Sequence, residues 1–159
     1  MSKALADLYD EHGEALRVAA PLFRDYGGRL VFEGPVCVLK VFEDNTLVRA
    51  MLEQAGEGRV LVVDGGGSLR CALVGDQLGE LAVKNAWAGL VVYGCVRDSE
   101  ALMQLPVGIK ALGSNPRKSV RRGEGAQDIP VRFAEISIQP GDYLYADRDG
   151  IIVADHKLG

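Results

Sequence analysis

The sequence predicts an α/β protein with a mostly parallel sheet, and three segments support that prediction. The segments RVLVVDGGG and GLVVYG are continuous apolar runs, and the residues between them, from Asp76 to Trp87, have the apolar spacing of a helix. Strands that are apolar on both faces suit a sheet buried on both sides, and a helical crossover makes them parallel. The segment VRFAEISIQPGDYLYADRDGIIVADH alternates around turns at Pro140–Gly141 and Asp149–Gly150, which predicts antiparallel strands.

Length and composition favour a single domain over residues 1–159. The chain has 159 residues and 48% hydrophobic content, which suits one full core. No segment approaches the apolar length that spans a bilayer, so we expect a cytoplasmic protein without a membrane partner. The net charge of −4 argues against direct binding of nucleic acid, which depends mainly on Lys and Arg. Three cysteines without a CxxC spacing favour reduced, buried thiols: Cys37, Cys71 and Cys95.

The N-terminal part of the chain predicts one helix and two short strands. Residues 4–19 have helical character, weakly patterned and broken at Gly13. Two β-branched runs, residues 29–34 and 36–42, follow a Gly27–Gly28 turn. Because Gly34–Pro35 is a turn signal between the runs, we expect two separate strands.

A second helix is predicted after these strands. Asp44 or Asn45 caps its start, and the helix ends at Gly56 and Gly58. Its apolar residues fall on one face, which should pack on the sheet. They are Leu47, Val48, Met51 and Leu52.

The two central strands place several polar residues at one edge of the sheet. Because the carboxyl ends of parallel strands point the same way, the loops after Val63 and Tyr93 open on the edge where α/β sheets usually bind ligands. We expect Arg97 and Asp98 to face the glycine loop and the helix start at Gly75–Asp76. That edge would combine a cation, carboxylates and helix N–H groups, which suits a small anion together with a divalent cation.

Each of these features also has a purely structural explanation. An aspartate at a helix start is most often an N-cap, and Arg–Asp pairs are common on surfaces. Convergence on one edge favours function, but spacing alone leaves the two alternatives about equal. The glycines after Asp64 do not fit a nucleotide loop, because the Lys-Ser/Thr pair of a P-loop and the G-x-G-x-x-G pattern are both missing. A likeness to the first glycine-rich motif of methyltransferases is superficial, because too few βα units follow.

One segment, NPRKSVRRGEG from Asn115 to Gly125, is strongly basic although the chain is acidic. A loop rich in Pro, Gly and charge is typical of a solvated connection between elements, which is the first interpretation. An anion-binding or partner-binding loop is the alternative.

Long stretches of the chain resemble the RraA-like family. They are FEDNTLVRAMLEQAGEGRVLVVDGGGSLRCALVGDQLGELAVKNAWAGLVVYGCVRDSEAL, PLFRDYGGR before it and PGDYLYADRDGIIV after it, and they cover about Asp7 to Val153. The most specific element is an aspartate, twenty intervening residues and then Arg-Asp, here Asp76 and Arg97–Asp98. The family includes 4-hydroxy-4-methyl-2-oxoglutarate aldolases and protein regulators of ribonuclease E.

The resemblance implies a swivelling β/β/α three-layer sandwich, with a mostly parallel central sheet, a second antiparallel sheet and helices on one face. It also implies a homotrimer or a dimer of trimers with sites between subunits. In the aldolase branch, the aspartate matching Asp98 holds a divalent metal, the arginine matching Arg97 contacts substrate, and the loop at the first aspartate contributes backbone contacts. This sequence keeps the set, which favours an enzyme over a regulator of ribonuclease E: Gly75, Asp76, Gln77, Leu78, Arg97 and Asp98.

The expected reaction is the metal-dependent retro-aldol cleavage of a small 2-oxo acid, 4-hydroxy-4-methyl-2-oxoglutarate, to two pyruvates. Mg²⁺ or Mn²⁺ held by Asp98 would stabilise a pyruvate enolate together with Arg97. Asp76 could orient the water that reprotonates this enolate. Decarboxylation of oxaloacetate passes through the same enolate and is the expected side activity.

Other catalytic groups have less support. His12 and His156 lie far in sequence from the motif, so a nucleophile paired with histidine is not expected. Cys95 is close to the motif, but its neighbours favour a packed thiol. Lys84 on the predicted helix could form a Schiff base, and metal dependence would separate that mechanism from the expected one.

Overall fold

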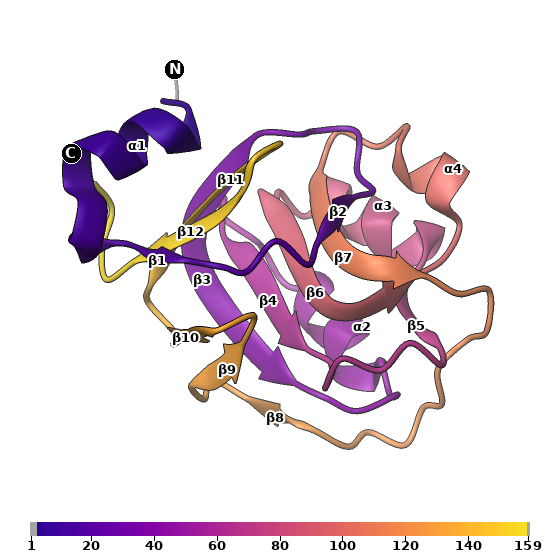
Figure 1. Ribbon diagram of the computed structural model, residues 1–159. Helices are drawn as coiled ribbons and strands as arrows, with labels where there is room; N and C mark the ends of the chain where they lie inside the picture. Colours follow the sequence, from indigo (N-terminus) through magenta and orange to yellow (C-terminus); the bar gives the residue numbers. More distant parts are fainter. Residues whose placement is uncertain (1–2, 159) are drawn as a thin grey trace.

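The computed structural model describes residues 3–158 and shows helices packed against a strongly curled mixed sheet (Figure 1). The helices are α1 Leu5–His12, α2 Thr46–Leu52, α3 Asp76–Lys84 and α4 Ser99–Leu102, with a 3₁₀ turn at Gly13–Ala15. The strands are β1 Arg17–Val18, β2 Arg24–Asp25, β3 Phe32–Lys40, β4 Val60–Asp64, β5 Ala72–Val74, β6 Gly89–Val96, β7 Gly108–Ser114, β8 Ala126–Gln127, β9 Val131–Phe133, β10 Ile136–Ile138, β11 Tyr143–Asp147 and β12 Gly150–Ala154.

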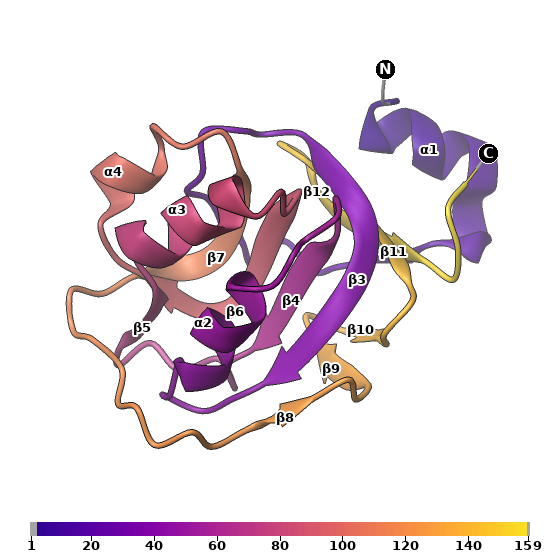
Figure 2. The ribbon, with the colours of Figure 1, turned by 180° about the vertical axis from the view of Figure 1, so that it is seen from behind.

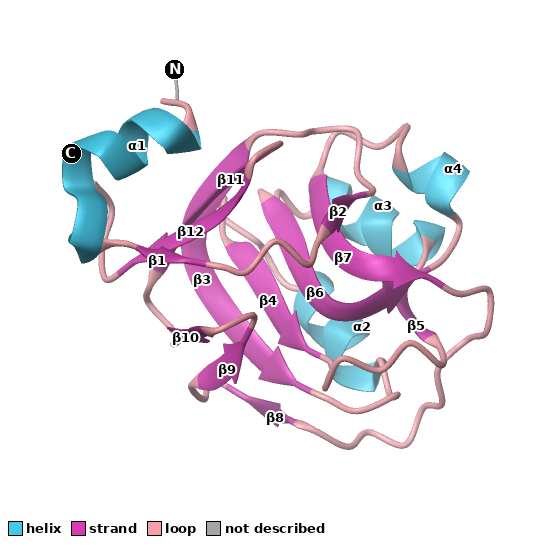
Figure 3. Cartoon of the chain, in the orientation of Figure 1, coloured by secondary structure: helices cyan, strands magenta, loops and turns pink. Residues whose placement is uncertain are grey.

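Parallel strands form the centre of the sheet, as the apolar runs predicted (Figure 3). β3, β4, β6 and β7 lie side by side in that order, and Val62 of β4 pairs with Val38 of β3 and Val91 of β6. All five residues of β4 are buried, because both faces of the sheet are covered. The short strand β5 pairs with β6, and the sequence pattern predicted neither β5 nor β7.

β3 is one continuous strand, so the expected turn at Gly34–Pro35 is wrong. Its first half pairs antiparallel with β11, and its second half, from Val36 onwards, pairs parallel with β4. Gly34 allows the backbone at Gly58 to lie close to β3, because a Cβ at Gly34 would lie 2.2 Å from the carbonyl oxygen of Gly58. The two apolar runs therefore belong to a single strand that joins the antiparallel and parallel parts of the sheet.

All three predicted helices are too long. α2 ends at Leu52, before the expected end at Gly56 and Gly58. α1 ends at His12, Gly13 follows with a φ of +49°, and residues 17–18 form β1 on the edge of β12. A glycine with positive φ ends a helix readily, which explains why the weak pattern beyond it is not helical. α3 ends at Lys84, and Trp87 instead packs into the core with 3% of its surface exposed.

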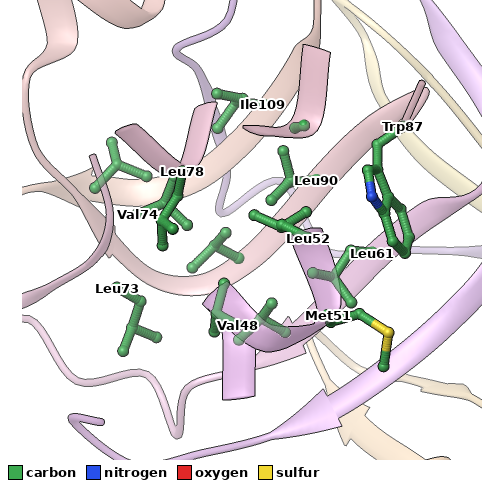
Figure 4. Close-up of a cluster of buried hydrophobic side chains, with 14 of the residues drawn as sticks. Val48, Met51, Leu52, Leu61, Leu73, Val74, Leu78, Trp87, Leu90 and Ile109 are labelled. Carbon is green, nitrogen blue, oxygen red and sulfur yellow. The ribbon is translucent and has the colours of Figure 1, made fainter. Parts of the chain in front are cut away.

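The sheet separates two hydrophobic cores. α2, α3 and α4 gather on one face (Figure 2), and the cluster beneath them is drawn in Figure 4. That cluster includes Val48, Leu52, Leu61, Leu78, Leu90 and Ile109. The other core lies between the parallel strands and the C-terminal segment, and it includes Val38, Val62, Val91, Ile138 and Leu144.

The C-terminal segment forms the antiparallel strands that its alternation predicted. β9 pairs with β10, and β11 pairs with β12 through the turn before Gly150. β1, β12 and β11 continue the sheet beyond β3, so the antiparallel part is joined to the parallel part through that strand. Within residues 3–158, no helix is long and apolar enough to cross a membrane.

Candidate active site

A cavity of about 300 Å³ lies beside the start of α3 and the end of β6. β5 and β6 are parallel neighbours, so the loops at their carboxyl ends meet and bring residues from distant parts of the motif together. The residues that the motif singled out all line this cavity: Gly75, Asp76, Gln77, Leu78, Arg97 and Asp98. The remaining lining residues are Asn45, Arg49, Ala72, Lys118, Ser119 and Arg121.

The start of α3 presents backbone N–H groups to the cavity. The Asp76 N–H donates a hydrogen bond to Asp98 Oδ2 at 3.0 Å. A Cβ on Gly75 would lie 2.7 Å from that same oxygen, so glycine leaves room for the carboxylate. Gln77 and Leu78 belong to the first turn, whose N–H groups have no acceptor within the helix. The helix start therefore adds a partial positive charge that suits an anion.

Asp98 is held in a backbone conformation that is uncommon for residues other than glycine. Its φ of 57° and ψ of 43° are left-handed, which costs about 1–2 kcal/mol for an L-residue. The N–H of Arg97 donates to Val74 O at 2.9 Å, and the N–H of Leu102 donates to Asp98 O at 2.9 Å. These bonds fix the chain on both sides of the strained residue, and strain of this kind concentrates at functional sites.

Asp76 and Asp98 are the two carboxylates that line the cavity, and Asp98 is the one that the resemblance assigns to a cation. Within residues 3–158, no group of three or more His, Cys, Asp or Glu side chains could hold a metal ion. Mg²⁺ in enzymes is usually bound through one or two carboxylates together with substrate and water. The donor set at Asp98 fits that kind of shared cation and does not fit a closed protein site of the structural zinc type.

The basic segment 115–125 forms part of the cavity wall through Lys118, Ser119 and Arg121. The Ala72 N–H donates to Arg117 O at 2.8 Å, so the segment is attached to β5. The first interpretation, a solvated connection, therefore describes only part of it. In the sequence, the one available signal was this concentration of cations in an acidic chain.

Asp44 attaches the same segment to α2. Its Oδ1 accepts bonds from Thr46 N at 3.0 Å and Thr46 Oγ1 at 2.7 Å, and its Oδ2 accepts bonds from Arg122 N at 2.8 Å and Glu124 N at 3.2 Å. Burial alone would raise the pKa of Asp44, but these four hydrogen bonds outweigh it and lower the pKa to about 2. The sequence predicted Asp44 or Asn45 as the cap of this helix; the bond from Asp44 to a segment 78 residues away was not foreseen.

Sequence reasoning also missed Asn45 and Arg49. The Asn45 Nδ2 donates to Leu73 O at 3.1 Å, which ties the start of α2 to β5 beside the cavity. Arg49 lies one turn further along α2. Asn45 was considered only as a helix cap, and neither residue carried a signal for the cavity, because only the packing of α2 beside β5 brings that end of the helix to it.

The glycine loop does not line this cavity, so the expectation that Arg97 and Asp98 face it is wrong. The N–H groups of Gly65 and Gly67 both donate to Tyr93 O at 3.1 Å, and the N–H of Gly66 donates to Asp64 Oδ1 at 2.9 Å. All three amides are thus bonded within the protein. A Cβ on Gly65 would lie 2.8 Å from Tyr93 O, so this glycine allows close packing on β6.

The less favoured catalytic groups lie outside the cavity. Lys84 is exposed at the far end of α3, and neither His12 nor His156 is among the lining residues. Burial raises the pKa of the Cys95 thiol, which disfavours the reactive thiolate. All three cysteines are free and buried, as expected.

A family model described as "RraA-like: Aldolase/RraA" matches residues 3–153. The chain belongs to the RraA-like family. A relative from Alkalilimnicola ehrlichii is 58% identical over 158 residues, which are 99% of this chain and 98% of that protein. Another from Laribacter hongkongensis is 57% identical over 153 residues, 96% of each chain. Both are named "Putative 4-hydroxy-4-methyl-2-oxoglutarate aldolase".

Two solved structures of high similarity have other names. The RNA-processing inhibitor RraA from Thermus thermophilis has a TM-score of 0.96 and 43% identity, covering 100% of this chain and 96% of that one. A Geobacillus kaustophilus protein named S-adenosylmethionine: 2-dimethylmenaquinone methyltransferase has a TM-score of 0.96 and 44% identity. The match covers 98% of this chain and 97% of that one. The RraA-like fold is therefore shown, whereas the names attached to it differ.

Proposed function

We propose that this RraA-like protein is a lyase that cleaves 4-hydroxy-4-methyl-2-oxoglutarate to two pyruvates by a retro-aldol reaction that depends on a divalent metal. The observation that carries the proposal is the meeting of Arg97, Asp98 and the start of α3 in one cavity. Relatives that match nearly the whole chain and carry the name of an aldolase support it. The methyltransferase name of the Geobacillus structure is not followed here. The N–H groups of the glycine loop are bonded within the protein, so they are not available to a nucleotide-type cofactor.

Substrate binding uses charges on both sides of the 2-oxo acid. The N–H groups of Gln77 and Leu78 bind a substrate carboxylate at the helix start. The Arg97 guanidinium donates hydrogen bonds to the substrate and provides a fixed positive charge. Asp98 would hold Mg²⁺ or Mn²⁺, and a bound cation would supply charge neutralisation at the 2-oxo end of the substrate.

The reaction breaks the C3–C4 bond of the substrate. The 4-hydroxyl gives its proton to the water beside Asp76 as C4 becomes the carbonyl carbon of one pyruvate, and the electron pair of the bond passes into the enolate of the other. Arg97 stabilises the charge that develops on the enolate oxygen. Asp76 orients a water that returns a proton to C3, which completes the second pyruvate. Loss of CO₂ from oxaloacetate produces the same enolate, so the site would also decarboxylate oxaloacetate.

Purified protein with 4-hydroxy-4-methyl-2-oxoglutarate, and separately with oxaloacetate, provides the direct test. We expect pyruvate release that stops with EDTA, returns with Mg²⁺ or Mn²⁺, and resists borohydride. Activity after complete chelation, or a reduced adduct on Lys84, would contradict the metal mechanism. We also propose a homotrimer or a dimer of trimers whose sites are completed by a neighbouring subunit; light scattering that reports an active monomer would contradict this assembly.

A non-catalytic regulator that binds and inhibits ribonuclease E is the second candidate. It is favoured by the similarity to the Thermus RNA-processing inhibitor. Inhibition by surface contact does not depend on a cation in the cavity, so the Asp98→Asn variant of a regulator should inhibit purified ribonuclease E as strongly as the wild-type protein does. Inhibition together with no pyruvate release from either substrate would favour the regulator.

A further inference from the structure

The cavity contains more positive charge than the proposed chemistry at C2 requires. Two carboxylates line it, Asp76 and Asp98, and four cationic side chains surround them: Arg49, Arg97, Lys118 and Arg121. Only Arg97 has a role in the proposed cleavage. Arg49 makes a long ion pair with Glu53 at 3.7 Å, and Lys118 and Arg121 make none within residues 3–158. Three cations therefore remain available to an anionic ligand.

Ser119 lies among these cations and its hydroxyl has no partner. The residue is 8% exposed and lines the cavity. Its Oγ is the buried side-chain oxygen or nitrogen that makes no hydrogen bond in the part of the chain that the structure describes. Buried hydroxyls almost always have a partner, so an oxygen atom of a bound ligand is the natural acceptor.

The surrounding backbone holds this group of residues in place before any ligand binds. The Val120 N–H, next to Ser119, donates to Glu43 O at 3.0 Å. The buried Asp44 carboxylate binds the N–H groups of Arg122 and Glu124, just beyond Arg121. Groups that are ordered in advance lose less entropy on binding, which favours a ligand subsite over a mobile charged surface.

We propose that Arg49, Lys118, Ser119 and Arg121 form a carboxylate subsite that binds the second carboxylate of the substrate, the one distant from the 2-oxo group. This rests on the proposed function, because it places the 2-oxo end at Arg97 and the start of α3. Arginine donates paired N–H bonds to a carboxylate, and the Ser119 hydroxyl adds one more. A 2-oxo acid with a methyl group at that end leaves the subsite unpaired, so the protein selects dicarboxylic 2-oxo acids.

Two ligands of equal chain length test the subsite without catalysis. 2-Oxoglutarate ends in a carboxylate and 2-oxopentanoate ends in a methyl group, and neither carries the 4-hydroxyl that cleavage needs. In calorimetry with Mg²⁺, wild-type protein should bind 2-oxoglutarate at least about tenfold more tightly than 2-oxopentanoate, as expected for charge-assisted hydrogen bonds. Ser119→Ala should reduce that preference without lowering the melting temperature, because its hydroxyl makes no bond within the protein. Arg49→Gln should reduce the preference further.

Arg122→Gln is the matched control, because Arg122 is in the same basic segment but does not line the cavity. It should keep the preference. Equal binding of the two ligands by wild-type protein, or equal losses in Arg122→Gln and Arg49→Gln, would overturn the subsite. Pyruvate release from 4-hydroxy-4-methyl-2-oxoglutarate is measured on the same preparation. A binding preference without pyruvate release supports the subsite and contradicts the proposed function; pyruvate release without a preference does the reverse.

Discussion

The glycine loop after β4 and the turn between β5 and α3 look alike in the sequence but differ in what their amides bind. Each follows a buried strand, and in each a carboxylate accepts one N–H: Asp64 from Gly66 at 2.9 Å, and Asp98 from Asp76 at 3.0 Å. After β4, the other glycine amides donate to Tyr93 O. After β5, the chain begins a helix whose first N–H groups face a cavity. Glycine content therefore does not determine whether a turn is available to a ligand.

The burial of the two carboxylates follows the same division. Asp64 is 6% exposed, whereas Asp98 is exposed and lines the cavity. A carboxylate that binds a cation together with substrate must keep one side open, because ligand and water occupy the remaining coordination positions. The comparison predicts that the same substitution will affect activity in one turn and stability in the other.

The largest effect is expected from Asp98→Asn. The amide is nearly isosteric but binds Mg²⁺ poorly, so pyruvate release should fall at least about a hundredfold while the fold persists. Steady-state kinetics and circular dichroism on the same preparation measure both properties. Asp64→Asn, the matched change at the other turn, should retain catalysis per folded molecule. Full pyruvate production by Asp98→Asn would contradict the enzyme proposal, and unchanged inhibition of ribonuclease E by this variant would support the regulator.

Gly75→Ala should reduce activity by about tenfold or more, because a displacement near 1 Å can cost that much. The backbone at Gly75 is extended and accepts alanine, but the new Cβ would lie 2.7 Å from Asp98 Oδ2 and displace the carboxylate. Gly113→Ala is the control, because its Cβ would meet only Cys95 Sγ at 3.8 Å. If both variants are equally active, Asp98 does not need its observed position.

Gly65→Ala should reduce the free energy of unfolding by about 1–3 kcal/mol, as overpacking of a buried site usually does. Its Cβ would lie 2.6 Å from Leu73 Cδ1 and 2.8 Å from Tyr93 O. Chemical denaturation measures the change. The folded variant should keep its catalytic rate, and a stable but inactive Gly65→Ala protein would show that the glycine loop binds a ligand after all.

Asp44→Asn tests the carboxylate that holds the basic segment. The folded pKa of about 2 lies below the usual value near 3.8, so the charged form stabilises the fold by about 2 kcal/mol at neutral pH. That contribution is complete above about pH 4 and is lost as the pH falls through about 2. Unfolding of both proteins between pH 7 and pH 2 should show a difference that shrinks below pH 4. A constant difference would mean that the carboxylate charge is not responsible.

Much of the parallel core was predictable because hydrophobic periodicity reports burial directly. VLVVD is buried along its whole length and forms β4, as its apolar run predicted. The break at Gly34–Pro35 was wrong because a local turn signal and a strand that changes partners have the same sequence pattern. β5 and β7 were missed because they are short or interrupted by polar residues such as Lys110, which is buried through an ion pair with Asp25 at 3.0 Å.

The sequence by itself predicted that Arg97 and Asp98 lie near Asp76, because parallel strands present their carboxyl ends at one edge. Only the tertiary structure supplied β5, whose parallel pairing with β6 brings the two turns together. Only the tertiary structure decided which glycines have free amides, because the partner of Gly65 and Gly67 is the carbonyl of Tyr93 in another strand. The tertiary structure also decided which cationic side chains line the cavity. Arg49 and Ser119 are 70 residues apart in the numbering and carry no shared pattern. Both line the cavity, because the buried Asp44 carboxylate holds the basic segment against the start of α2.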